Sequence, residues 1–501
     1  MRLGELLILR GIAGPSDIVL ALERQQTMGG RLGDHIVALG VISAEEIARL
    51  LNETPAIPRT IAETGVTRGN LMNLFLKFML VNACELISDL SERMKLQQTV
   101  VQELVDDAVK RQLLQVLGST TVGVVRHIRY TLTDQGRVAA SEALARNRYI
   151  GPAPVALTSY QAQVLQQPIV RESLNSGTFQ EGFEGLLVSE RNLRKLLPAV
   201  NSGQTILLYG PPGNGKTSIG QRVANLFSQP VNIPYAIEVE GQIIKVHDAS
   251  LHISFIDQPE RVIAELNTIS TGFGLQIESF DPRWVICKRP VVTAGGELSI
   301  DMLDLRYDSE SKTYDAPLHM KALNGVFLID DFGRQKVSPT ELLNRWIVPL
   351  ESRVDYLKLN TGKSFSIPFD ELVIFSTNLE PADLMDPAFL RRIPYKIYMG
   401  GPDRHEYRKI FDQAAAGQGL TIAEDVFNFI VSQLTGRNAY GLAYFQPKFI
   451  CSQARQVCQC FGLPFVITRE LAQEALSNLY VESGDPRQGL EVVHSDLNAA
   501  A

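Results

Sequence analysis

The stretch Gly210-Pro-Pro-Gly-Asn-Gly-Lys216-Thr217 follows directly on the apolar run from Thr205 to Tyr209. It matches the pattern G-x-x-x-x-G-K-[ST], in which a glycine-rich backbone surrounds phosphate oxygens, lysine reaches the β- and γ-phosphates and the hydroxyl coordinates Mg²⁺. A helix from Ser218 to Phe227 would add its dipole. A glycine-rich turn with a chance lysine is the alternative, but a strand before and a helix after favour a nucleoside triphosphate. The residues expected to bind it are Gly210, Pro211, Pro212, Gly213, Asn214, Gly215, Lys216, Thr217 and Ser218.

Two later apolar runs end in polar residues of the kind that a nucleotide-hydrolysing site needs. The run from Gly325 to Ile329 ends in Asp330-Asp331, and the run from Leu372 to Thr377 is followed by Asn378. We expect Asp330 to hold Mg²⁺ and Asp331 to orient and deprotonate the attacking water, with the Asn378 amide beside the γ-phosphate. Each run alone is equally consistent with a core strand that has a solvated end. Their order after the phosphate-binding motif favours the functional interpretation.

In these motifs the chain resembles the AAA+ ATPase family, from about Phe179 to Leu479. The resemblance implies an α/β core with a parallel sheet and flanking helices over residues 179–400, followed by a helical lid over 401–484. It also implies ATP with Mg²⁺, and an oligomer, most simply a ring, with a hexamer as one option. In the family's terms Lys216 and Thr217 match the Walker A pair, Asp330 and Asp331 the Walker B pair, and Asn378 sensor 1.

The resemblance extends to basic residues near the end of the core and in the lid. Arg392, just before a strand that ends at Ile397, matches the arginine finger that completes a neighbouring subunit's site, with Arg391 as the other candidate. Removal of such a finger costs orders of magnitude in turnover. In Phe445-Gln-Pro-Lys448 a proline precedes a helix, so that Lys448 is similar in position to a sensor 2 residue.

Two features depart from the family pattern. Asp331 is one methylene shorter than the usual glutamate, which predicts slow hydrolysis or a differently placed water. The stretch from Asn232 to Leu323 is longer than a minimal core needs, and it contains the strand-like runs 235–239, 242–246 and 284–289. Such an insertion forms either substrate-facing loops or an extension of the sheet, and the sequence leaves both open.

The first 54 residues contain an internal repeat with an offset of 29 positions. Arg2-Leu3-Gly4 corresponds to Arg31-Leu32-Gly33, and helical spacing places the apolar positions of each copy on one face. The further matched pairs are Glu5 with Asp34, Leu7-Ile8 with Ile36-Val37, Gly11 with Gly40, Ile18 with Ile47, and Leu22 with Leu51.

This tandem resembles the MshEN domain at the N-termini of type II secretion and type IV pilus ATPases, which binds cyclic di-GMP. A doubled motif suits a two-fold symmetric ligand, because arginine stacks on a purine and hydrogen-bonds its edge while leucines cover the rest. The second copy has Thr54 where the first has Gln25. A docking module without the ligand is the alternative. The residues expected to bind cyclic di-GMP are Arg2, Leu3, Gly4, Gly11, Leu22, Gln25, Arg31, Leu32, Gly33, Gly40 and Leu51.

Residues 63–153 predict a winged-helix-like domain. Helices are expected over 71–91 and 99–116, then a strand and turn over 130–136 and a helix over 137–145. Basic residues outnumber acidic ones between positions 108 and 150, so that DNA binding is open, although winged helices also dock proteins and that role is preferred. The basic residues are Lys110, Arg111, Arg126, Arg129, Arg137, Arg146 and Arg148, against Asp134 and Glu142.

The composition is that of a cytoplasmic globular protein. The chain has 501 residues, of which 45% are hydrophobic and 21% charged, with a net charge of −7 that argues against a general nucleic-acid coat. Its five cysteines have no metal-binding spacing and are expected as reduced thiols. Charged and polar residues interrupt every long apolar run, so neither a membrane span nor a signal peptide is expected. Residues 154–178 are expected to be a linker and 485–501 a flexible tail.

Together these features predict a bacterial AAA+ motor or remodelling ATPase that cyclic di-GMP regulates. Two alternatives remain open from the sequence: an ATP-dependent DNA-binding initiator or transcription regulator, and a nucleotide switch that recruits partners without hydrolysis. The protein client is not identified by any residue. Only the type of N-terminal module suggests an envelope, pilus or secretion process.

Overall fold

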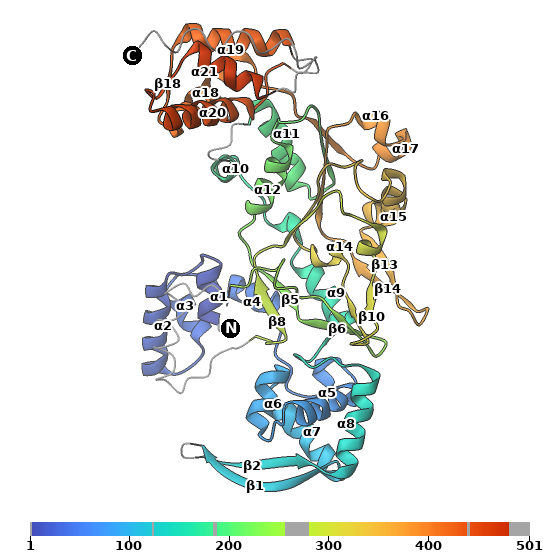
Figure 1. Cartoon of the computed structure of the whole chain (residues 1–501). Coiled ribbons are helices and arrows are strands. Elements are labelled where there is room, and N and C mark those ends of the chain that lie inside the picture. The colour runs from blue at the N-terminus through green and yellow to red at the C-terminus, as the bar shows by residue number, and fades with distance from the viewer. Residues whose placement is uncertain (1–2, 123–124, 184–187, 256–279, 438–440, 480–501) are drawn as a thin grey trace. The chain divides into compact units, whose positions relative to one another are not determined.

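The computed structural model describes residues 3–122, 125–183, 188–255, 280–437 and 441–479 (Figure 1). The chain divides into two compact units. Unit 1 comprises residues 1–182, 195–208 and 217–397, and unit 2 comprises 183–194, 209–216 and 398–501. No helix in the described ranges is long and apolar enough to cross a membrane. None of the five cysteines, which all lie in the described ranges, forms a disulfide.

The N-terminal module, residues 3–54, consists of two helix pairs that repeat the same packing. Gly4 in the first pair leaves room for Ile18 and Leu32, and Gly33 in the second leaves room for Leu3 and Ile47. Each glycine therefore contacts one isoleucine of its own copy and one leucine of the other, as two-fold related copies must. The helices are α1 (Leu3–Leu9), α2 (Pro15–Met28), α3 (Leu32–Ala38) and α4 (Ala44–Asn52).

Residues 65–153 form a helical cluster with one long hairpin. The expected helix over 71–91 is two helices, because Ala83 adopts a φ of +49° and ends the regular hydrogen bonding. The expected helix over 99–116 stops at Lys110, and Gln112 with a φ of +59° turns the chain into a strand. The order is α5 (Arg68–Val81), α6 (Ile87–Met94), α7 (Gln98–Lys110), β1 (Leu114–Val122), β2 (Val125–Leu132) and α8 (Asp134–Arg146).

The core sheet of unit 1 has the order β16-β4-β15-β12-β9. The predicted strand over 372–377 is confirmed, and those before Gly210 and Asp330 are confirmed to within one residue. β15 lies between β4 and β12, so that the strand leading to Asn378 separates the other two. The bounds are β4 (Ile206–Tyr209), β9 (Val291–Ala294), β12 (Val326–Ile329), β15 (Leu372–Thr377) and β16 (Tyr395–Tyr398).

The long insertion builds mainly a second sheet, of order β10-β11-β7-β6-β3, and only β9 joins the core sheet. The expectation of a plain extension is therefore wrong for most of the described part, while residues 256–279 lie outside it. β8 pairs with β5. The strands are β3 (Val155–Ala156), β5 (Val231–Pro234), β6 (Ala236–Val239), β7 (Gln242–Lys245), β8 (Trp284–Cys287), β10 (Arg306–Asp308) and β11 (Thr313–Asp315).

Residues 154–178, expected as a linker, are built into unit 1. β3 belongs to the second sheet, and Tyr160 and Val164 of α9 are buried in the same apolar cluster as its strands. The helices of this segment are α9 (Leu157–Gln166), η2 (Ile169–Arg171) and α10 (Ser176–Gly182).

Helices and one hairpin complete unit 1 around the sheets. Pro339 opens α15 behind a capping box of Ser338 and Glu341, which satisfies the first backbone N–H groups. The remaining elements are η1 (Ala62–Thr64), α12 (Lys216–Asn225), η3 (Ile300–Leu303), α14 (Leu318–Lys321), α15 (Pro339–Ser352), β13 (Val354–Lys358), β14 (Ser364–Pro368), α16 (Pro381–Leu384) and α17 (Pro387–Leu390).

Unit 2 has a helical core of its own, in which Tyr407, Phe411 and Phe427 are buried against one another. Its helices are α18 (Arg404–Gly417), α19 (Glu424–Arg437), α20 (Gln446–Phe461) and α21 (Arg469–Ser477), with the short paired strands β17 (Thr421–Ile422) and β18 (Val466–Ile467). α11 (Glu190–Asn201) begins in this unit. The expected tail, 485–501, lies outside the described residues.

Arg283 joins the two segments that lead into and out of residues 65–153. Its side chain is 3% exposed and forms a buried ion pair with Asp281, with a closest N–O distance of 2.8 Å. Nη1 donates to the carbonyls of Thr64 and Pro154, both at 3.1 Å. A buried cation needs such partners, since an unpaired charge in the interior is strongly destabilising.

Arg283→Met is therefore expected to lower the free energy of unfolding of unit 1 by about 3–5 kcal/mol, because it leaves Asp281 buried without its cation. Urea unfolding followed by tryptophan fluorescence measures this, as Trp284 and Trp346 both lie in unit 1. Arg306→Met, which removes an exposed ion pair with Asp315, is the control and should cost less than about 1 kcal/mol. Equal losses in the two variants would contradict the role assigned to Arg283.

Candidate nucleotide site

The phosphate-binding motif forms a loop that only glycine can complete. Gly213 has a φ of +78°, and a Cβ placed there would lie 2.2 Å from the Phe445 ring at the start of α20. Gly215 has a φ of +76°. Left-handed φ values of this kind suit glycine, and they turn successive backbone N–H groups toward one point. Phe445 N also donates to Gly213 O at 3.2 Å, so that the loop and the first turn of α20 are joined within unit 2.

Lys216 is directed back at its own loop. Its side chain is 6% exposed, and Nζ donates to the carbonyls of Gly210 at 2.8 Å and Pro211 at 2.9 Å. Asn214 is also buried and donates to the Met399 carbonyl at 3.2 Å. The lysine cation is thus placed inside the loop that the glycines form. Lys448, the sensor 2 candidate, is exposed in the first turn of α20.

Within unit 1, Thr217 and Asp330 contact each other directly. Thr217 Oγ1 lies 2.9 and 2.8 Å from the two carboxylate oxygens of Asp330. A hydroxyl and a carboxylate are the hard oxygen ligands that Mg²⁺ takes in small number, with water and phosphate oxygens completing its shell. The part of the chain that the structure describes has no group of three or more His, Cys, Asp or Glu side chains able to enclose a metal.

Asp331 and Asn378 also contact each other. Asn378 Nδ2 donates to Asp331 Oδ1 at 3.2 Å, and Asp331 is exposed with a φ of +50°. This backbone conformation is unfavourable for a non-glycine residue, so neighbouring contacts must maintain it. The exposed carboxylate is placed next to an amide donor and open to water.

Two residues that sequence reasoning missed hold the Asp331 turn. Thr377 Oγ1 donates to Phe332 O at 2.7 Å, and Gln335 Nε2 donates to Asp330 O at 2.7 Å. Thr377 is 1% exposed, so its bond is shielded from water. A hydroxyl at the end of an otherwise apolar strand was the available signal for Thr377. No sequence signal pointed to Gln335, because its role depends on a turn that the sequence does not reveal.

The two arginine-finger candidates differ in their surroundings. Arg392 is held by an ion pair to Glu351 of α15 at 2.5 Å, and its guanidinium lies 5.9 Å from the centre of the Phe389 ring. Arg391, at the end of α17, is exposed. The two adjacent arginines therefore present one cation bound within its own chain and one directed to solvent.

In the N-terminal module most of the motif residues carry out structural roles. Leu3, Leu22 and Leu32 are buried in the core, and Gly11 and Gly40 adopt φ values of +65° and +74° in turns. The side chain of Leu51 and all of Arg2 lie outside the described residues.

Gln25 and Thr54, which occupy the last motif position of the two copies, also form hydrogen bonds within the module. Gln25 is 2% exposed and donates to Gly30 O at 2.8 Å, and Thr54 Oγ1 donates to Leu50 O at 2.8 Å. Arg31 is exposed at the start of α3. The exchange of glutamine for threonine therefore keeps an internal bond, while Arg31 stays on the surface.

Several basic residues between positions 108 and 150, the region of the β1–β2 hairpin, form ion pairs with carboxylates. Arg111 pairs with Asp107 at 2.9 Å, Arg129 with Glu85 at 2.5 Å, and Arg148 with Glu310 at 3.4 Å. The side chain of Arg126 lies outside the described residues. The positive charge available to a polyanion is therefore lower than the residue count between 108 and 150 predicts.

Comparison with known proteins gives one curated relative and many structural matches. The chain is 22% identical over 337 residues to a 26S proteasome regulatory subunit 6B homolog of Encephalitozoon cuniculi, with 63% of this chain and 67% of the relative covered. A family model described as a domain of unknown function (DUF8689) matches residues 403–478, the helices of unit 2. The sequence relative supports an AAA+ ATPase-like relationship.

Solved structures match at low similarity. The RuvB Holliday junction branch migration motor of Thermotoga maritima aligns with a TM-score of 0.31 and 14% identity, over 62% of this chain and 73% of RuvB. NtrX of Brucella abortus aligns with a TM-score of 0.37 and 11% identity, over 71% of this chain and 69% of NtrX.

Proposed function

We propose that this chain is an ATP-hydrolysing AAA+ ATPase that works as an oligomer. The contact between Thr217 and Asp330 carries this proposal, because it brings the hydroxyl of the phosphate-binding motif to a carboxylate that lies 113 positions later. Asp331, the residue after Asp330, supplies a base, and Asn378, which contacts it, supplies an amide.

Each residue has a distinct role in the proposed reaction. Lys216 would exchange its two carbonyl partners for phosphate oxygens, which are stronger acceptors for a cation. Thr217 and Asp330 would hold Mg²⁺, which neutralises charge on the phosphates when bound. Asp331 would accept the proton of the attacking water, with Asn378 fixing its carboxylate. Because Asp331 is shorter than glutamate, we expect turnover toward the slow end of this class.

Lys216→Ala should weaken ATP binding about 100-fold or more, since a charge-assisted bond to a buried group contributes about 1.5–3 kcal/mol and this lysine makes more than one. Calorimetric titration with Mg-ATP measures the change. Lys358→Ala, at an exposed position of β13, is the matched control and should leave the affinity unaltered. Unchanged affinity in the Lys216 variant would rule out the nucleotide site.

The oligomer proposal rests on a solvent-exposed arginine that could reach a neighbouring copy. Arg391 is exposed, whereas Arg392 would have to leave Glu351 before it could reach a second copy. We therefore propose Arg391 as the finger in a partner's site, with Arg392 as the residue that fixes the end of α17 against α15. The relationship to a proteasome regulatory ATPase subunit is consistent with assembly but does not specify the number of copies.

Arg391→Ala should keep ATP affinity but reduce turnover about 10³-fold, as loss of a transition-state cation does. Arg392→Ala should reduce turnover less than tenfold and lower thermal stability instead. Phosphate release and calorimetry on the same samples separate the two effects. If Arg392→Ala alone abolished turnover, the assignment would be reversed, and full turnover in both variants would exclude a shared site. ATP-dependent assembly without phosphate release from the unmodified protein would favour a nucleotide switch.

The N-terminal module is proposed to bind cyclic di-GMP. Support comes from the two helix pairs, in which Gly4 and Gly33 have equivalent neighbours, and from the exposed position of Arg31 at the start of the second copy. A ligand with two equivalent halves would find two equivalent surfaces. It would regulate the ATPase only if it bound one state of the chain more tightly than another.

Cyclic di-GMP titrated into the full chain should bind, and the double variant Arg2→Ala/Arg31→Ala should bind at least about tenfold more weakly, a loss of about 1.4 kcal/mol. Arg59→Ala, exposed just after the module, is the control. Absence of binding to the unmodified chain would assign the module to protein docking.

DNA binding has less support than protein docking. Three of the cations in the hairpin region already have carboxylate partners, and a polyanion would have to compete with each. The helix α7 followed by the long β1–β2 hairpin keeps a winged-helix-like role open as a docking element for a client.

A further inference from the structure

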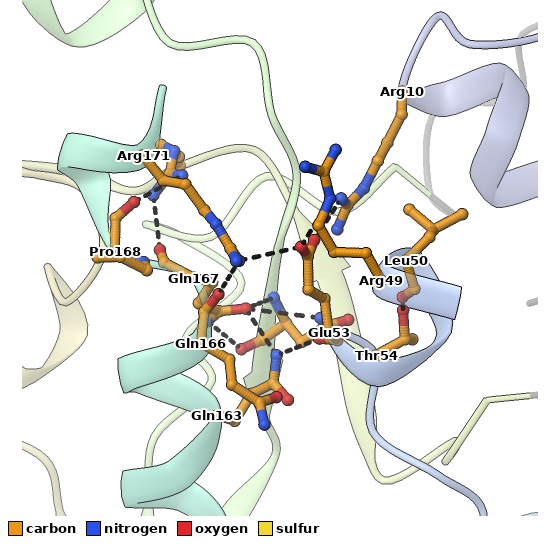
Figure 2. A network of polar contacts seen from close by, with 12 residues as sticks. Arg10, Arg49, Leu50, Glu53, Thr54, Gln163, Gln166, Gln167, Pro168 and Arg171 are labelled. Atoms are coloured by element: carbon orange, nitrogen blue, oxygen red, sulfur yellow. Dashed lines mark hydrogen bonds and ion pairs between the residues drawn. The ribbon is translucent and has the colours of Figure 1, made fainter. Parts of the chain in front are cut away.

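Glu53, the residue after α4, is surrounded by three arginines (Figure 2). Its carboxylate lies 2.9 Å from Arg10 Nη1, 3.1 Å from Arg171 Nη1 and 3.7 Å from Arg49 Nε. The Glu53 side chain is 14% exposed. Arg10 and Arg49 belong to the N-terminal module, but Arg171 belongs to η2, beyond the whole of residues 65–153. One carboxylate thus joins the module to a distant segment of the chain.

The segment on the other side, residues 163–171, is named here the junction segment. Gln163 Nε2 donates to the Glu53 carbonyl at 2.9 Å, and Gln167 Nε2 donates to Asn324 Oδ1 at 2.9 Å. Ile169 N donates to Asp370 Oδ2 at 3.2 Å. The segment is therefore bonded to the N-terminal module along one side and to the core along the other.

The core residues that bind the junction segment share one position in the fold. Arg289 donates to the Gln167 carbonyl at 3.1 Å, and Asn324 and Asp370 bond to each other at 2.7 Å. Arg289 precedes β9, Asn324 precedes β12 and Asp370 precedes β15, in each case by two residues. The other ends of β12 and β15 lead into Asp330 and Asn378. The junction segment thus lies across the starts of the strands that carry the candidate catalytic residues.

The N-terminal module has a second attachment of a different kind. Phe280 and Ile286 are buried in the same apolar cluster as the module's helices. Apolar burial is non-directional, whereas an ion pair requires one arrangement of its partners and weakens as salt screens it. The apolar contact is therefore less directional than the Glu53 cluster, which adds contacts of defined geometry between the module and the junction segment.

We propose that Glu53 is a latch between the N-terminal module and the junction segment, which couples the orientation of the module to the starts of β9, β12 and β15. Closing the latch restrains the junction segment through the ion pair between Glu53 and Arg171, and opening it leaves Arg171 bonded to the Gln166 carbonyl within that segment. The consequence for catalysis depends on the proposed ATPase function, but the restraint itself does not. Any ligand or partner that reorients the module would act on the core through this contact.

The test compares hydrogen exchange in full-length Glu53→Gln and Arg171→Gln with that in Glu45→Gln. Glutamine keeps the shape of Glu53 and leaves the Gln163 bond to its carbonyl intact. Glu45 is exposed on α4, so its variant makes the same charge change on the same helix. Peptides covering 163–172 should exchange about fivefold faster in both latch variants, as expected for loss of about one partly buried ion pair, and should be unchanged in the control. The double variant should exchange no faster than Glu53→Gln alone, because the ion pair that Arg171→Gln removes is one that Glu53→Gln has already removed.

Several results would overturn the latch. Exchange at 163–172 equal to that of the control would do so, as would additive effects of the two substitutions, since independent loosening would then explain both. Faster exchange confined to 44–54 would mean that Glu53 only caps α4. Peptides covering 326–329 and 372–377 report the coupling to the strands, and unchanged exchange there would refute that coupling. Phosphate release measured on the same samples tests the ATPase proposal separately, because the exchange results do not require turnover.

Discussion

The buried guanidinium of Arg289 is the constraint on which the core of unit 1 depends. It is 5% exposed, and burial lowers its pKa, while Glu172 and Asp370 act in the opposite direction. The cation is accommodated because it donates to the carbonyls of Gln167 and Asn324 and pairs with Glu172 at 3.4 Å. These partners come from the junction segment and from the start of β12. One cation therefore bonds both to the junction segment and to the residue two positions before β12.

The same edge of the sheet contains a second buried ionisable group, Glu371, which has different surroundings. Glu371 is fully buried just before β15, and no hydrogen-bond partner for its carboxyl oxygens is found in the described ranges. Burial, first, and the neighbouring Asp370 raise the pKa of Glu371 well above its ordinary value. One edge of the sheet thus holds a paired cation and a buried acid whose carboxyl group has no hydrogen-bond partner in the described part of the chain. The opposite ends of β12 and β15 remain polar and open, where Asp331 and Asn378 meet.

The candidate binding residues and the contacts of the junction segment depend on different parts of the chain. The glycines of the phosphate loop and the bond between Thr217 and Asp330 are local consequences of one motif and one strand end. The contacts of Arg171, Gln163 and Gln167 connect segments more than 100 positions apart in the sequence. Because each of these contacts is polar and partly shielded, each is directional, and together they give the N-terminal module a defined path to the core. The tandem repeat therefore has a physical connection to the core sheet, whatever ligand or partner it recognises.

The sequence by itself determined the local chemistry. A strand, a glycine loop and a helix in series predicted the phosphate loop, and the apolar runs before Asp330 and Asn378 predicted their strands to within a residue, since short buried strands are recognisable from composition alone. Spacing of 29 residues likewise predicted the two equivalent helix pairs. Tertiary structure alone decided that 154–178 is core, that the insertion forms a second sheet, and that Arg392 is held by Glu351 while Arg391 is exposed. It alone also placed Arg171 beside Glu53. These outcomes depend on charges and backbone carbonyls from distant segments, which leave no periodic signal, whereas a motif or an apolar strand is written in consecutive residues.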